Sequence, residues 1–136
     1  MKRVFVLLVL VLTMVNSVPK KLNLRFLGHS GFKLQFPDPK DKSVTRTIYI
    51  DTWPDNSHFP DSARKELNDA DLLLVTHGHS EHSSGTPKIF FDSMNNKKSP
   101  KIGCIFELSH YFSSQHKIPM DCICPMNKGG PVDFGF

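Results

Sequence analysis

The stretch Asp71-Leu72-Leu73-Leu74-Val75-Thr76-His77-Gly78-His79-Ser80-Glu81-His82 decides the fold and the chemistry predicted for this chain. Its first part, residues 72–75, is an apolar run that is typical of a buried strand. His77 and His79 are two residues apart, so in extended backbone both rings leave the chain on the same side. Imidazole and carboxylate groups together suit zinc, and also manganese or iron. The stretch therefore predicts a metal site in a loop directly after a buried strand.

A chance cluster of polar surface residues is the alternative interpretation of this loop. Three histidines and Glu81 follow an apolar strand within a six-residue span, which composition alone rarely produces. The metal site is therefore the favoured interpretation. Gly78 allows a tight turn between the first two histidines, and Ser83 or Ser84 is predicted to cap a helix after the loop.

Alternating and β-branched runs elsewhere predict a layered α/β fold with a mixed sheet. A hairpin is expected from residues 23–27 and 32–36, around the turn Gly28-His29-Ser30-Gly31. Further strands are expected at 45–50, 102–106 and 120–124. Helices are expected at 61–68, with Asp61 as the cap, at 85–91 and at 107–115.

The loop motif Thr-His-Gly-His-Ser-Glu-His at 76–82 resembles the T-H-x-H-x-D-H signature of the metallo-β-lactamase superfamily. Phe26-Leu27-Gly28-His29-Ser30-Gly31-Phe32 is similar to the opening of the branch that holds ascorbate-6-phosphate lactonases and related metal-dependent hydrolases. Three further stretches of that branch have similar counterparts here, in the same order: Ile48-Tyr49-Ile50-Asp51, residues 105–108 and residues 126–130. The motif departs from the family at Glu81, where the family has Asp.

This resemblance implies an αββα sandwich, of which the chain would supply the first half. It also implies a site with two zinc ions, manganese being the alternative metal. His77 and His79 would hold the first metal, and Glu81 and His82 the second. Asp51 would accept a hydrogen bond from a ligating histidine, and His29 would lie at the rim of the substrate site.

The activity implied by the resemblance is hydrolysis of an ester, lactone or phosphoester bond in a small-molecule substrate by metal-activated water, with Glu81 and Asp51 as the catalytic carboxylates. In the family a His, a bridging Asp and a last His follow the stretch matched by residues 126–130. Here no His follows His116, and Asp133 is the only acidic residue after Gly130. We therefore expect residues 18–136 to be a C-terminally incomplete domain with impaired activity. The alternative is a secreted metal-binding or interaction protein without turnover.

The N-terminus predicts a secretory signal peptide over residues 1–17 and therefore a secreted or secretory-pathway protein. Met1-Lys2-Arg3 is a charged start, and an apolar run follows to Val15. This run is short for a membrane span, so no stable span is expected. The net charge of +4 is mild and the lysines and arginines do not cluster, which argues against nucleic acid as a partner.

Two features of the sequence bear on how the domain is completed. Cys104, Cys122 and Cys124 are an odd number of thiols for an oxidising compartment. A disulfide between Cys104 and one of the other two is the alternative, and three buried free thiols are the favoured interpretation. A half-sandwich would also leave one apolar sheet face uncovered, including Ile48, Ile50, Leu72 and Leu74. A homo-oligomer through that face is one expected consequence.

Overall fold

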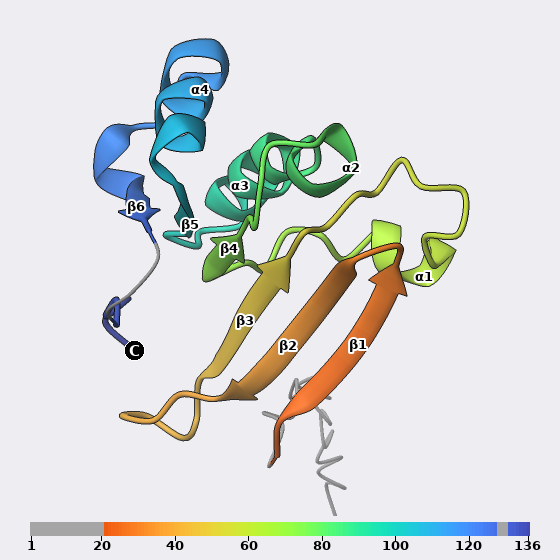
Figure 1. Cartoon of the computed structure of the whole chain (residues 1–136). Coiled ribbons are helices and arrows are strands. Elements are labelled where there is room, and N and C mark those ends of the chain that lie inside the picture. The colour runs from red at the N-terminus through yellow and green to blue at the C-terminus, as the bar shows by residue number, and fades with distance from the viewer. Residues whose placement is uncertain (1–20, 128–130) are drawn as a thin grey trace, which may run out of the picture.

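The computed structural model describes residues 21–127 and 131–136, and these form one six-stranded mixed sheet with helices (Figure 1). The strands lie in the sheet in their chain order, from β1 to β6. The predicted signal peptide and residues 128–130 of the predicted family motif lie outside the described residues. The prediction of an α/β fold with a mixed sheet is confirmed.

The first three strands are antiparallel. β1 (Asn23–Gly28) and β2 (Gly31–Pro37) form the predicted hairpin, and β3 (Thr45–Ile50) pairs along β2 with Phe32 opposite Ile50. Because β2 runs against β3, the turn between β1 and β2 lies beside the end of β3. This places the Gly28–Gly31 turn next to Asp51.

The last three strands run parallel to β3. They are β4 (Leu72–Leu74), β5 (Lys101–Ile105) and β6 (Ile123–Met126). The connections contain α1 (Asp61–Arg64), α2 (Ser80–Ser83), α3 (Thr86–Asn95), α4 (Phe106–His116) and the 3₁₀ turn η1 (Met120–Cys122). Residues that follow β3 and β4 therefore meet at one edge of the sheet, as the ends of parallel strands do.

The hydrophobic core lies between one face of the sheet and the helices. Tyr49, Leu73 and Ile102 project from neighbouring strands, and Phe90 of α3 and Phe112 of α4 pack on that side. All five side chains are almost fully buried. This packing holds β3 and β4 rigidly, so their C-terminal ends are fixed positions for functional side chains.

The opposite face of the sheet is apolar and only partly covered. Ile48, Ile50 and Leu74, which were predicted to be uncovered, are half-buried there, and Leu72 is only 3% exposed. Residues 131–136 lie at that end of the sheet, where Lys101 Nζ donates a hydrogen bond to the carbonyl oxygen of Phe134. The prediction that Leu72 is uncovered is therefore wrong.

Several predicted element boundaries also change. α1 is shorter than expected, and its N-cap is Pro60 rather than Asp61. α2 begins at Ser80, so neither Ser83 nor Ser84 caps the helix after the loop. The expected strand at 120–124 is a 3₁₀ turn followed by β6, because Cys122 donates its N–H to the Pro119 carbonyl.

The three cysteines are free thiols, and Cys104 is buried in the core. Burial raises the pKa of the Cys104 thiol to about 11, so this thiol stays protonated and packs as an apolar group. In the part of the chain that the structure describes, no helix combines the length and hydropathy needed to cross a membrane.

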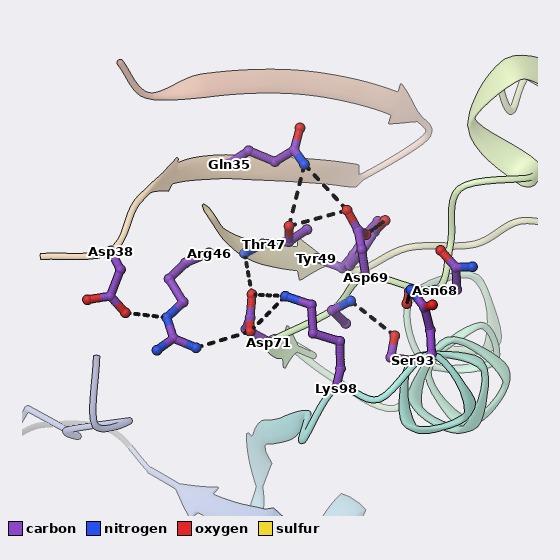
Figure 2. A network of polar contacts seen from close by, with 12 residues as sticks. Gln35, Asp38, Arg46, Thr47, Tyr49, Asn68, Asp69, Asp71, Ser93 and Lys98 are labelled. Atoms are coloured by element: carbon purple, nitrogen blue, oxygen red, sulfur yellow. Dashed lines mark hydrogen bonds and ion pairs between the residues drawn. The ribbon is translucent and has the colours of Figure 1, made fainter. Parts of the chain in front are cut away.

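A polar network anchors β4 at the end opposite the histidine loop (Figure 2). Asp71 accepts hydrogen bonds from the Thr47 N–H at 2.8 Å, Arg46 Nη1 at 3.2 Å and Lys98 Nζ at 3.1 Å. Arg46 also donates from Nε to Asp38, which lowers the pKa of that carboxyl to about 2. The network fixes the start of β4 against β3, and with it the register that aligns their far ends.

We expect Asp71→Ala to lower the free energy of unfolding by about 2–3 kcal/mol. The substitution leaves the buried Thr47 N–H without its acceptor. It also removes the ion-pair partner of Lys98 and one of the two ion-pair partners of Arg46. Chemical denaturation would measure the loss. Asp92→Ala is the matched control: its partner Lys88 is exposed and one helical turn away, so we expect a change of at most about 0.5 kcal/mol. Equal effects of the two substitutions would contradict a structural role for the network.

Candidate metal centre

Three segments meet at the C-terminal edge of β3 and β4. Asp51 directly follows β3, and Thr76 and His77 follow β4. The backbone N–H of Asp51 donates to the Leu74 carbonyl at 3.0 Å, which ties the two strand ends together. The Gly28–Gly31 turn adds His29 from the side. The sheet topology therefore gathers the residues that the sequence marked, although they are up to 53 positions apart.

The Gly28–Gly31 turn requires unusual backbone. Gly28 has φ +90°, and a Cβ atom there would lie 3.1 Å from the His58 carbonyl oxygen. His29 has φ +53° and Asp51 has φ +40°, conformations that cost free energy for a residue with a side chain. Such strained positions concentrate at functional sites.

Asp51 is the buried acceptor around which the site is built. Its side chain is 5% exposed. One carboxylate oxygen accepts the Thr76 N–H at 2.9 Å, and the other accepts the Thr76 hydroxyl at 2.6 Å. The second oxygen also lies 2.8 Å from His82 Nδ1. Asp51 therefore holds both the strand end that precedes the loop and the last histidine of the motif.

These contacts assign protons on two imidazoles. A carboxylate can only accept, so His82 Nδ1 carries the proton it shares with Asp51. The Thr76 hydroxyl donates its single proton to Asp51. The Thr76 hydroxyl oxygen therefore accepts a hydrogen bond from His77 Nδ1, which lies 2.9 Å away. Both Nδ1 atoms are donors, which leaves the Nε2 lone pairs of His77 and His82 for another partner. A carboxylate behind an imidazole has this orienting effect in metal sites.

Ser30 connects the turn to the same cluster, a contact that the sequence reasoning missed. Its hydroxyl oxygen lies 3.1 Å from His82 Nδ1 and 3.0 Å from His29 Nδ1. The His29 ring packs edge-on against Trp53 and against His82, with centroids 5.7 and 5.4 Å apart. The only sequence signal for Ser30 was its place in the Gly-His-Ser turn. Trp53 therefore contacts the site through the His29 ring.

The three loop histidines lie together. The His77 ring centroid is 4.6 Å from that of His79 and 4.0 Å from that of His82. Glu81 Oε1 lies 4.0 Å from His79 Nδ1, and the His79 side chain is 75% exposed. A hydrogen bond from its own backbone N–H, aided by the Ser80 hydroxyl, lowers the pKa of Glu81. Glu81 is therefore an anion at neutral pH, next to the imidazoles.

The donor set fits zinc in its chemistry: neutral imidazole nitrogens with an ionised carboxylate are zinc ligands. Over residues 21–127 and 131–136, however, no group of three or more His, Cys, Asp or Glu side chains is arranged so that it could hold a metal ion. The loop rings instead pack against one another. Metal binding would therefore require the exposed side chains of the loop to turn.

The chain is similar to several proteins named UPF0173 metal-dependent hydrolase. It is 34% identical over 116 residues to the one from Paracoccus denitrificans, a match that covers 84% of this chain and 44% of the relative. It is 33% identical over 109 residues to the one from Herpetosiphon aurantiacus, covering 79% and 40%. For the Sulfolobus acidocaldarius relative the identity is 32% over 111 residues, covering 82% and 44%. No family model matches the chain.

The mixed sheet and the histidine loop at its edge define a metallo-β-lactamase-like α/β fold. With these relatives, the chain belongs to the UPF0173 family of metal-dependent hydrolases. It spans less than half of the length of the curated relatives that it matches. The resemblance drawn from the sequence motifs is therefore confirmed.

Proposed function

We propose that this chain carries the metal-binding part of a hydrolase that cleaves an ester, lactone or phosphoester bond. The observation that carries the proposal is the buried Asp51 carboxylate, which fixes Nδ1 protons on His77 and His82 and leaves their Nε2 atoms unused. The relatives' name, metal-dependent hydrolase, supports a metal cofactor. Zinc is the metal we propose, because imidazole nitrogen and carboxylate oxygen are both zinc ligands, and manganese is the alternative.

Each of the marked residues has a proposed role at this site. His77 and His79 would be ligands of one zinc ion, and Glu81 and His82 would be ligands of a second that needs further donors to be retained. Bound zinc would supply a water molecule acidified toward neutral pH. The chain's own groups would then orient the reactants: Asp51 holds the His82 ring, and the Glu81 carboxylate accepts a proton or hydrogen bond from the attacking water.

His29 is the proposed contact with substrate at the rim. The Nδ1 atom of His29 is hydrogen-bonded to the Ser30 hydroxyl, which lies within the cluster. The other ring nitrogen, Nε2, then faces away from Ser30 on an exposed residue. This arrangement would present an N–H group to a substrate oxygen.

Metal-dependent turnover tests the proposed function. We expect the purified chain with zinc to hydrolyse a p-nitrophenyl ester, a lactone or bis(p-nitrophenyl) phosphate weakly. A chelator should abolish the activity and added zinc restore it. His77→Ala with His79→Ala should lower the rate at least about 100-fold, as loss of a metal site does. His110→Ala, an exposed histidine on α4, is the matched control and should leave it unchanged.

Two other outcomes are informative. Turnover that a chelator does not affect would contradict metal-dependent hydrolysis. Zinc binding without turnover on any substrate would favour the alternative, a non-catalytic metal-binding protein.

A secretory location is also part of the proposal: it rests on the charged start and apolar run of residues 1–17. N-terminal sequencing of the secreted chain should place the cleavage after Ser17.

A further inference from the structure

The Ser30 hydroxyl lies between two imidazole rings of the site. Its oxygen is 3.1 Å from His82 Nδ1 and 3.0 Å from His29 Nδ1. In the part of the chain that the structure describes, these two nitrogens are the hydrogen-bonding partners of this hydroxyl. His82 is a proposed metal ligand and His29 is the proposed substrate contact. Ser30 therefore joins two residues with different roles.

The direction of these two hydrogen bonds follows from the buried Asp51 carboxylate. His82 Nδ1 carries the proton that it shares with Asp51, 2.8 Å away, so it has no lone pair for the Ser30 proton. The Ser30 oxygen is therefore a second acceptor of the His82 N–H group. The Ser30 proton then goes to His29 Nδ1, which is the unprotonated nitrogen of that ring.

The reverse direction, with His29 Nδ1 donating to Ser30, would leave the Ser30 proton without an acceptor among the described residues. The two neighbouring imidazoles therefore hold opposite tautomers. His82 is protonated at Nδ1 and His29 is protonated at Nε2.

The His29 ring is also held in one orientation. It packs edge-on against Trp53 and His82, at interplanar angles of 88° and 80°. Its backbone φ of +53° costs free energy, yet the residue is exposed to solvent. Burial therefore does not explain this arrangement, whereas strained backbone is typical of functional sites.

We propose that Ser30 is a positioning residue of the hydrolase, which links His29 to the ligand cluster and aims the His29 Nε2–H group at a substrate oxygen. The inference rests on the proposed function and adds the group that fixes His29. The oxygen concerned is the carbonyl or phosphoryl oxygen that gains negative charge when water attacks. A donor that is fixed in place before the reaction stabilises such an oxyanion without having to reorganise. The hydrogen bond from His82 also makes Ser30 a stronger donor, because hydrogen bonds in a chain polarise one another.

Nitrogen-15 NMR of the imidazole rings, on the full chain without added metal, tests this link independently of turnover. At about pH 8.5, where imidazole side chains are neutral, we expect His29 to be protonated at Nε2 and His82 at Nδ1. Ser30→Ala should move the His29 Nδ1 resonance toward that of free histidine and leave the His82 tautomer unchanged. Ser30→Thr keeps the hydroxyl and should restore the wild-type His29 resonance. Ser43→Ala removes an exposed hydroxyl that is bonded to Asp41, and as the matched control it should change neither ring.

Turnover by the zinc-loaded chain is the second readout. His29 would act on charge that develops only in the transition state, so Ser30→Ala should lower kcat about 10-fold and leave KM nearly unchanged. His29→Ala should lower kcat at least as much. Adding Ser30→Ala to His29→Ala should lower kcat no further, because Ser30 acts through His29.

Three results would overturn the proposal. One is a wild-type chain whose His29 proton is on Nδ1, a result that decides even if Ser30→Ala does not fold. Another is a folded Ser30→Ala chain whose His29 resonances match those of the wild type. The third is a pair of independent losses in kcat that multiply in the double variant. If the resonances behave as expected and the wild type turns over no substrate, the proposed function fails while the link from Ser30 to His29 stands.

Discussion

Asp51→Ala should lower the affinity of the chain for zinc by about 10- to 100-fold, as the loss of an orienting carboxylate does in metal sites. The substitution removes the acceptor that holds His82 Nδ1 and the Thr76 hydroxyl, and through Thr76 the orientation of His77. Two of the proposed ligands would lose their fixed tautomer in one step. Calorimetric titration with zinc measures the effect directly, whether or not the chain turns over substrate.

Two further variants separate this orienting role from a loss of fold. Thr76→Val keeps the shape of the side chain and removes only the hydroxyl between Asp51 and His77, so a several-fold loss of affinity is expected. Asp55→Ala removes an exposed carboxylate from the neighbouring loop and should change nothing. Wild-type affinity in a folded Asp51→Ala chain would contradict the assignment of Asp51.

Glu81→Ala should abolish metal-dependent turnover, whereas Glu81→Asp should retain or improve it. Glu is one methylene longer than Asp, so its carboxylate must fold back to occupy the position that the shorter residue takes. A misplacement of about 1 Å at a reacting centre can cost about 100-fold in rate. The prediction applies to a polypeptide that extends over the relatives' full length.

The ratio kcat/KM of the Glu81 variants would measure this effect. Glu66→Ala is the control, because its carboxylate pairs with Arg25 on the surface and lies away from the site. If Glu81→Ala and the wild type were equally active, the Glu81 carboxylate would be neither a ligand nor a base.

The arrangement of the strands was largely predictable from the sequence because burial leaves a periodic signal. Alternation in the first hairpin and the β-branched run at 45–50 correctly located β1, β2 and β3. The apolar run before the histidines located β4. Helix starts were less predictable, because a capping residue type does not show where its side chain goes. Ser83 donates its hydroxyl to the His79 carbonyl within α2, and Asp61 pairs with Arg64.

The chemistry of the site was predictable only as a set of residue types. The H-x-H-x-E-H spacing named His77, His79, Glu81 and His82, and the structure brings the three rings together. The role of Ser30 was not predictable, because its contact with His82 spans 52 residues and depends on how β2 pairs with β3. The burial of Leu72 also escaped prediction, because the apolar run at 72–75 does not show what lies over each of its side chains.

Zinc stoichiometry is the most direct test of the central claim, that the loop after β4 binds metal. The chain is passed through gel filtration with excess zinc, and bound metal is measured by elemental analysis. The account predicts about one zinc ion per chain, because the ligands of the loop complete only part of a two-metal site. It predicts loss of that zinc in His77→Ala and its retention in His110→Ala. A chain that carries no zinc, with His77→Ala indistinguishable from the wild type, would contradict the account.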